Sequence, residues 1–327
     1  MNPLFGHEEA VAAFREGMAS GRMHHAWLIS GPAGIGKALF AQKAALRLLA
    51  DAAGPKVDLG GLEVPDEHPI ARLAEAGSHP DLMRLERLAR EDGGDLARNI
   101  TIDQVRSLQR LFVTTPSQSP WRAVIIDSVD DLERGAANAL LKNLEEPPPQ
   151  SIFLLVSHAT ERLLPTIRSR CRQLRLSALS ADAMTSALRA ALPEANENEI
   201  SSLAALGEGS PGRALAFRGL DVAALDQAME EIAKRGDRTN ARRSALAQSL
   251  SARSAQPRYE AFLNRAPSLI AREAKRRRGR ALAEALGLWE RAHDLAGSAT
   301  RLSLDPQTVV FELAGMLATL APRQADG

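Results

Sequence analysis

The sequence predicts a parallel α/β domain followed by two helical domains. In the first half, apolar strand-like runs alternate with helix-like segments, and glycine-rich turns separate them; this pattern is typical of parallel sheets with crossover helices. After Leu176 the strand-like runs stop, and from about Asp221 the pattern is helical. A chain of 327 residues is also longer than one core usually organises. The predicted domains are residues 1–176, 177–220 and 221–327.

Three apolar runs in the first domain are predicted to be buried strands. Each is short, continuous and apolar, as expected for strands covered on both faces. These runs are residues 26–30, 123–127 and 151–157.

Helices are predicted between these strands. Residues 37–50 are rich in alanine and leucine, which favour helix. Asp103 is a candidate N-cap for a second helix. Residues 131–146 carry leucine and alanine at helical spacing, and the three prolines at 147–149 end that helix. Residues 51–80 are rich in Gly, Pro and Asp and are expected to form a long excursion.

The remaining chain is predicted to be helical. Two short helices are expected at 180–192 and 197–206, and the segment GEGSPGRAL (207–215) interrupts them and starts another. Breaks in the last domain are expected near its glycines and prolines. These positions are Gly236, Pro257, Gly279, Gly297 and Pro306.

Composition narrows the class of protein. The net charge is +1, so nucleic-acid contact would need a local patch rather than a polycationic chain. A single cysteine excludes an intrachain disulfide and a cysteine-based zinc site, which fits a reducing cytoplasm. No signal peptide and no apolar run of ~20 residues is seen, so we expect a cytoplasmic protein without membrane contact.

Residues 31–38, GPAGIGKA, match the phosphate-loop pattern G-x-x-x-x-G-K-[ST] except at the last position. Gly31, Gly34 and Gly36 would permit a tight loop whose N–H groups surround phosphates, and Lys37 would reach the β and γ phosphates. The last position should carry a hydroxyl for Mg²⁺, but Ala38 stands there. We expect a degenerate nucleotide site.

A second nucleotide motif is also incomplete. The run VIIDSVDD ends a predicted strand at Asp127, the position that holds Mg²⁺ in such proteins. The next residue is Ser128, which cannot serve as a base near neutral pH. Asp130 and Asp131 are expected to cap the following helix. Because phosphoryl transfer depends on positioning and electrostatics, losing the metal ligand and the base should reduce hydrolysis by orders of magnitude.

Three further segments carry a family resemblance. They read AANALLKNLEEPP (136–148), LLPTIRSRC (163–171) and MHHAWLI (23–29). Together they resemble the clamp-loader AAA+ subunits of bacterial DNA polymerase III over most of the first 220 residues. The resemblance implies an AAA+ P-loop domain, a small helical lid domain and a C-terminal helical collar domain that joins subunits.

The family contains motor subunits with intact nucleotide motifs and a delta-prime class with degraded motifs that keeps the SRC sequence. Ala38 and Ser128 resemble the delta-prime class, as does Gly212, which stands where a motor's sensor arginine is expected. The resemblance implies that Arg170 is an arginine finger for a neighbouring motor's ATP site. The alternative is a surface arginine in a salt bridge within the chain. A guanidinium suits the finger because it is always charged and can bridge phosphate oxygens.

The implied partners are motor subunits and a delta subunit in a heteropentamer, which would load the sliding clamp onto primer-template DNA as part of the polymerase holoenzyme. No cofactor is required, although weak ATP or ADP binding stays open, and the isolated chain is not expected to hydrolyse ATP. Two alternatives are a motor-type loader with its own hydrolysis and a nucleotide-binding regulator or repair factor with the same core.

Family members often carry a four-cysteine zinc module in the excursion, but residues 51–81 contain no cysteine, and His68 and His79 are too few for structural zinc. We therefore predict no zinc, and structural roles for His24 and His25.

The basic segment 272–280 could contact DNA or an acidic partner, or be a solvated helix face, which we favour. Cys171 lacks an evident partner for a nucleophilic role.

Overall fold

The computed structural model describes residues 3–89, 96–302 and 304–321. They belong to two compact units, Met1–Leu215 and Ala216–Gly327. The first unit contains a parallel sheet and three lid helices, and the second is helical. The α/β plus all-α fold class is thereby confirmed, while the domain boundaries at 176 and 220 stay predictions.

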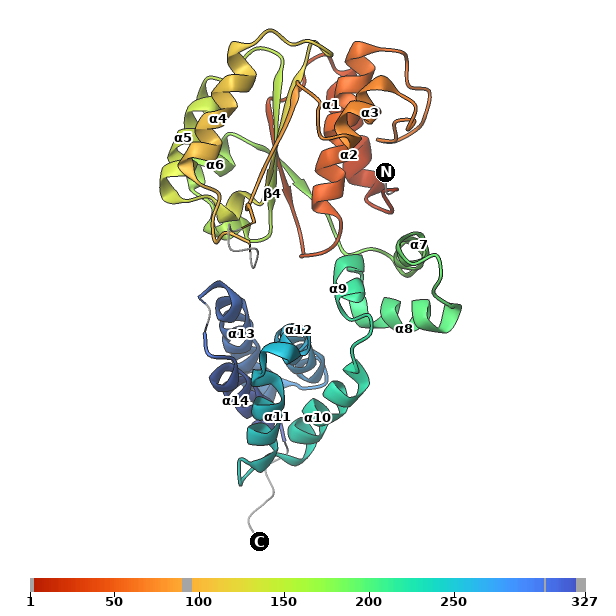
Figure 1. Cartoon of the computed structure of the whole chain (residues 1–327). Helices are drawn as coiled ribbons and strands as arrows, with labels where there is room; N and C mark the ends of the chain where they lie inside the picture. The colour runs from red at the N-terminus through yellow and green to blue at the C-terminus, as the bar shows by residue number, and fades with distance from the viewer. Residues whose placement is uncertain (1–2, 90–95, 303, 322–327) are drawn as a thin grey trace. The chain divides into compact units, whose positions relative to one another are not determined.

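The sheet of the first unit has five described strands, all parallel to their neighbours, in the order β2-β3-β4-β1-β5 (Figure 1). The central strands are buried apolar runs, as the sequence predicted. The two edge strands are shorter or more polar, and the sequence did not reveal them. The strands are β1 (Ala26–Ser30), β2 (Leu82–Glu86), β3 (Arg122–Asp127), β4 (Ser151–Ser157) and β5 (Arg172–Arg175).

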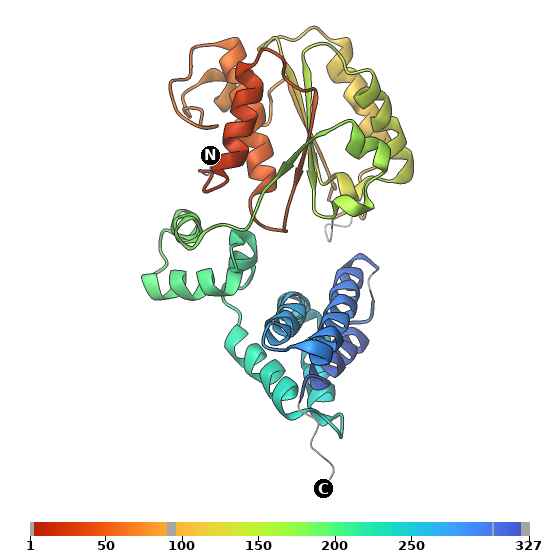
Figure 2. The same cartoon turned by 180° about the vertical axis from the view of Figure 1, so that it is seen from behind.

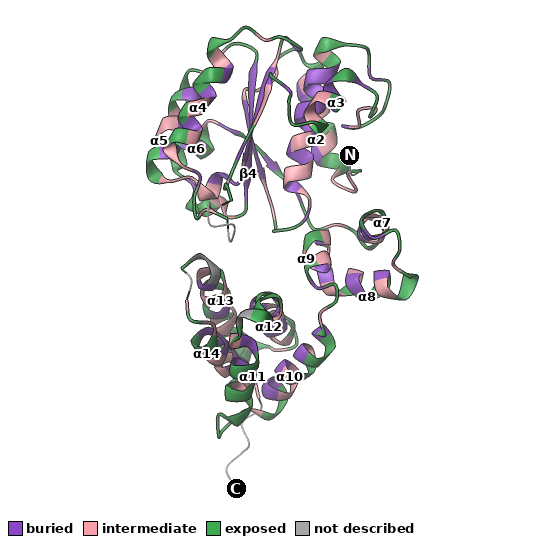
Figure 3. Cartoon of the chain, in the orientation of Figure 1, coloured by how far each residue is buried: buried purple, intermediate pink, exposed green. Residues whose placement is uncertain are grey.

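Helices cover both faces of this sheet (Figures 1 and 2). One face carries α1, α2 and α3, and its core gathers around Phe14, Trp27 and Phe40. The other face carries α4, α5 and α6, with Leu140 and Phe153 in its core; burial is concentrated between the layers (Figure 3). The helices are α1 (Glu8–Ala19), α2 (Lys37–Ala53), α3 (Pro69–Glu75), α4 (Ile102–Val113), α5 (Arg134–Glu145) and α6 (Pro165–Ser169).

Two predicted helix starts need correction. The N-cap of α4 is Thr101 rather than Asp103, because Thr101 and Gln104 form a reciprocal capping box. Asp103 lies in the first turn of that helix. The helix predicted from residue 131 begins at Arg134, because residues 129–131 form a separate 3₁₀ turn.

The excursion after α2 is organised around one buried arginine. The Arg47 side chain is 2% exposed and forms an ion pair with Asp51, one turn further along α2. Its guanidinium also donates hydrogen bonds to loop carbonyls, at 3.1 Å to Val57, 2.7 Å to Leu59 and 3.0 Å to Glu63. A short helix, α3, follows this loop. The guanidinium of Arg47 thus holds the excursion against α2.

The lid segment holds α7 (Ala181–Ala191), α8 (Glu197–Gly207) and α9 (Pro211–Ala216), close to the predicted positions. In the second unit, α14 packs on α10, α11, α12 and α13. Gly297 lies inside α13, so the predicted break there is wrong; a lone glycine weakens a helix without ending it. The helices of this unit are α10 (Val222–Arg235), α11 (Ala241–Ser251), α12 (Gln256–Ala274), α13 (Gly279–Arg301) and α14 (Pro306–Ala318).

Within the described residues, none of the helices is both long and apolar enough to cross a membrane.

Candidate functional site

The phosphate loop joins the end of β1 to the start of α2, which is the context its motif requires. Gly31, Gly34 and Gly36 have φ angles of 142°, 73° and 100°, a region that glycine adopts without a steric penalty. At Gly31 a Cβ atom would also lie 2.3 Å from the carbonyl oxygen of Leu176. The loop therefore needs glycine for its backbone shape, whether or not it binds phosphate.

Lys37 begins α2 and turns its ammonium back into the loop. Its Nζ donates to the carbonyl oxygens of Gly31 at 2.7 Å and Pro32 at 2.6 Å, and the residue is 3% exposed. Burial lowers the pKa of Lys37 to about 8, against the opposing effect of Asp130 and Asp127. The lysine that would meet the β and γ phosphates is thus satisfied by its own loop.

The lid is attached to the same loop. The Gly212 N–H donates to the Gly34 carbonyl at 2.9 Å, and Ser210 Oγ donates to the Ala33 carbonyl at 2.9 Å. A Cβ atom at Gly212 would lie 2.9 Å from the Gly34 Cα, so this contact excludes a side chain there. Arg213, the next residue, instead pairs with Glu208 at 2.8 Å. The arrangement leaves no space at position 212 for a sensor arginine.

The predicted metal carboxylate is paired with an arginine. Asp127 ends β3, and Arg84 on the neighbouring strand β2 donates to it at 2.8 Å. The same guanidinium lies 2.8 Å from Glu86. Ala38, the second residue of α2, offers a methyl group where a hydroxyl would ligate Mg²⁺. Arg84 could not be identified from the sequence, because its contact with Asp127 depends on the pairing of β2 with β3.

Asp130 does not cap the following helix, contrary to prediction. Ser128 caps the short 3₁₀ turn at 129–131, and α5 has Glu133 at its N-cap without a side-chain hydrogen bond. Asp130 instead accepts hydrogen bonds from Ser128 Oγ at 2.7 Å, Ser157 Oγ at 2.8 Å and the His158 N–H at 2.5 Å. The carboxylate thereby joins the ends of β3 and β4, and Ser128 is committed to the turn.

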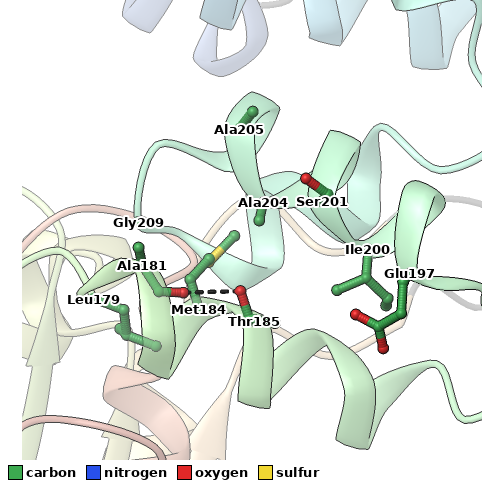
Figure 4. Close-up of a pocket in the computed structure, with 10 residues that line it drawn as sticks. All are labelled: Leu179, Ala181, Met184, Thr185, Glu197, Ile200, Ser201, Ala204, Ala205 and Gly209. Atoms are coloured by element: carbon green, nitrogen blue, oxygen red, sulfur yellow. Dashed lines mark hydrogen bonds between the residues drawn. The ribbon is translucent and has the colours of Figure 1, made fainter.

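Two hollows lie near the lid. An apolar one of about 170 Å³ borders the phosphate loop and is lined by residues 3–5, 34–36 and parts of α7 and α9. A larger one of about 520 Å³ lies between α7 and α8 (Figure 4). Glu197 on its wall is paired with Arg189, and Thr185 donates to the Ala181 carbonyl. The larger hollow therefore offers no uncommitted acid or base among the side chains described there.

Arg170 lies at the C-terminal end of α6, on the surface of the α/β domain. Its side chain is 33% exposed, and it forms an ion pair with Glu145 at 2.7 Å. Its Nη1 donates to the Thr166 carbonyl at 3.0 Å. The salt bridge within the chain that we considered as an alternative is therefore present, although a third of the side chain is accessible. The finger role stays a prediction.

The neighbouring Cys171 is buried, and burial raises the pKa of its thiol to about 12. A thiolate is the nucleophilic form of cysteine. The thiol is therefore a core group beside Arg170.

The histidines contact the protein's own backbone and one another. His24 and His25 stack with ring centroids 4.6 Å apart, and the ring of His25 contacts the Leu144 carbonyl at 3.1 Å. Burial lowers the pKa of His25. His68 caps α3 through the Ile70 N–H, and His79 accepts from the Asp81 N–H. In the described part of the chain, no three His, Cys, Asp or Glu residues gather as a metal site would require; the prediction about zinc stays a prediction.

The basic segment 272–280 spans the end of α12 and the start of α13. Arg272 pairs with Glu230, Arg276 with Glu273 and Arg280 with Glu284. Three of the six cations of this segment are thus paired with neighbouring acids, and the solvated helix face stays a prediction.

A family model described as DNA polymerase III, delta subunit, matches residues 6–180, more than half of the chain. The chain belongs to this clamp-loader family. It is 37% identical over 198 residues to the DNA polymerase III subunit delta' of Pseudomonas aeruginosa, covering 61% of this chain and 57% of that protein. It is 33% identical over 231 residues to the subunit tau of Escherichia coli, covering 68% of this chain and 33% of that protein.

Matches to the gamma subunits of Buchnera aphidicola also occur, with 31% identity over 195 residues for one of them, covering 60% of this chain and 50% of that protein. The chain spans about half the length or less of these curated relatives. Among solved structures, a gamma subunit-related protein of Thermotoga maritima covers 94% of this chain and 98% of its own, with 14% identity and a TM-score of 0.44.

Proposed function

We propose that this chain is the delta-prime stator of a clamp loader: it does not hydrolyse ATP, and it donates Arg170 to the ATP site of an adjacent motor subunit. Its partners would be motor subunits and a delta subunit in a heteropentamer, and through that complex the sliding clamp and primer-template DNA. It would need no cofactor of its own, and its loop would bind ATP or ADP weakly at most.

The pairing of Asp127 with Arg84 carries this proposal. A Walker-type aspartate holds Mg²⁺ through its negative charge. Here a guanidinium already balances that charge, and Ala38 supplies no oxygen ligand. Ser128 offers no carboxylate to orient water and is tied to Asp130. Hydrolysis needs a free carboxylate for Mg²⁺, a hydroxyl ligand and a residue that orients water. In this site the first is paired with an arginine and the other two are absent.

The position of Arg170 supports the second half of the proposal. Cys171 and Ile167 on either side are buried in the core between the sheet and α5. The backbone is thus anchored while a third of the arginine side chain is accessible. Arginine fingers given in trans accelerate phosphoryl transfer by ~10³–10⁵ in other systems.

Single-turnover ATP hydrolysis by the complex reconstituted with its motor subunits tests the proposal. Arg170→Ala should convert one site's share of fast hydrolysis into a phase at least ~10³-fold slower, given the usual size of a finger effect. Arg168→Ala, which removes an exposed arginine two residues earlier, is the matched control. Unchanged kinetics with Arg170→Ala would refute the finger.

An ATPase assay on the isolated chain tests the proposal that it does not hydrolyse ATP. It should show no Mg²⁺-dependent ATPase above background. Turnover that disappears in Lys37→Ala would instead establish a motor-type subunit.

A further inference from the structure

Glu145 is the acidic partner of the partly exposed Arg170 and is the last residue of α5. Its Oε1 lies 2.7 Å from Arg170 Nη2, and the two side chains are 48% and 33% exposed. The second contact of the guanidinium is the Thr166 carbonyl. Since a guanidinium has five N–H donors, these two contacts leave donors free while restricting the orientation of the group.

The frame around this pair is firmly packed. Leu144, Ile167 and Cys171 lie in one buried cluster that joins α5 and α6. The backbone atoms of positions 145 and 170 are therefore held together by core packing. The arginine side chain is long and has many rotamers when it lacks a partner. Glu145 supplies that partner from a fixed helix end.

Helix electrostatics do not explain a carboxylate at this position. The C-terminal end of a helix carries partial negative charge, which disfavours an acidic side chain there. Glu145 and Glu146 both stand at this end of α5 and are exposed. Of the two, Glu145 has a cation beside it, whereas Glu146 makes no ion pair within the described residues. The contact with Arg170 offsets the unfavourable position of Glu145.

We propose that Glu145 is a positioning residue for Arg170, and this inference rests on the proposed function. Its carboxylate holds the guanidinium along the α5–α6 edge, so that the free donors are already oriented when the neighbouring subunit's nucleotide arrives. A pre-oriented group loses less conformational freedom in the transition state, and small misplacements of such groups can slow catalysis by ~10². Glu145 would therefore affect the rate of hydrolysis without contacting the nucleotide.

The test uses the full chain in the complex reconstituted with its motor subunits. Glu145→Gln keeps the size of the side chain and removes its charge. We expect the fast hydrolysis phase assigned to Arg170 to slow by about 5- to 20-fold, less than the ~10² that a misplaced group can cost because the Thr166 contact remains, with the KM for ATP unchanged within about twofold. Glu145→Asp, which keeps the charge, should recover part of the rate. Glu146→Gln is the matched control and should behave like the unaltered chain.

A merely structural salt bridge is distinguished by the double variant. If Glu145 acts through Arg170, Glu145→Gln adds no further loss to Arg170→Ala. An additive loss, an effect equal to that of Glu146→Gln, or faster hydrolysis would overturn the inference. If Arg170→Ala itself has no effect, the proposed function fails first. If Arg170→Ala slows hydrolysis but Glu145→Gln does not, the positioning role fails alone.

Discussion

Replacing Arg47 by methionine should destabilise the first unit, because the excursion after α2 depends on that buried cation. The substitution keeps an apolar stem of similar length and removes the guanidinium. The carbonyls of Val57, Leu59 and Glu63 would then lose this donor, and Asp51 would keep only its contact with Arg15. Removing one partner of a buried ion pair costs ~3–5 kcal/mol. The Asp51 side chain is 29% exposed and Leu59 is 48% exposed, so water can reach part of this cluster, and we expect the low end, about 3 kcal/mol.

Arg15 offers a matched control within the same cluster. It forms an ion pair with Asp51 at 2.7 Å, but its side chain is 35% exposed. Exposed pairs contribute about 0.2–1 kcal/mol. Arg15→Met should therefore lower the free energy of unfolding by less than about 1 kcal/mol, although it removes a cation from the same carboxylate.

Urea unfolding followed by tryptophan fluorescence measures both variants. A Trp289→Phe background leaves Trp27 and Trp121 as reporters, and both lie in the first unit. Amide hydrogen exchange at residues 54–66 should show faster opening in Arg47→Met alone. Addition of EDTA should leave the unfolding midpoint of the unaltered chain unchanged. Equal destabilisation by the two arginine variants, or a large effect of EDTA, would refute the reasoning.

Two further predictions concern buried ionisable groups. The pKa of Lys37 is about 8 in the folded chain and ~10.4 when unfolded; between these values the unfolded state binds more protons, so the free energy of unfolding should rise with pH. Lys37→Met should flatten that rise in urea titrations between about pH 8 and pH 10, and an unaltered slope would contradict the assignment. The raised pKa and burial of Cys171 predict that iodoacetamide labels it only after unfolding. Rapid labelling of the native chain would contradict this prediction. Labelling of the Arg170→Ala variant would show whether loss of the neighbouring side chain opens the site locally.

The interior of the fold could be predicted from sequence, but its edges could not. The three strands found in advance are continuous apolar runs, since each is covered by helices on both faces. The edge strands mix polar and apolar residues, as in the RQLR of β5, where Leu174 is the buried residue. Such short mixed patterns occur equally in loops. The start of α4 was misplaced because Thr101 and Asp103 are both good capping residues, and the choice between them depends on Gln104.

In the candidate site too, some features could be predicted from local motifs and others depend on the packed structure. Ala38 and Ser128 are visible as departures from local motifs, so the loss of a metal ligand and of a base could be predicted. Arg84 could not be assigned a partner, because its ion pair with Asp127 requires the register in which β2 lies beside β3. The hydrogen bond of Ser210 to Ala33 joins residues 177 positions apart. Contacts of this length depend on the packed structure rather than on local sequence.

Because of these long-range contacts, the missing hydroxyl at position 38 and the missing carboxylate at position 128 are only part of the difference from an intact nucleotide site. If Ala38 and Ser128 were the whole defect, a hydroxyl and a carboxylate at those positions would restore the chemistry. Arg84 would still compete with Mg²⁺ for Asp127, and Gly212 would still lie against Gly34 with no space for a sensor arginine. Ser128 also caps the turn that carries Asp130, so its replacement would disturb the junction of β3 with β4. Under the proposed function, loss of hydrolysis would therefore come from the packing of the site as well as from two substitutions, and it would suit a subunit that contributes an arginine to another subunit's nucleotide.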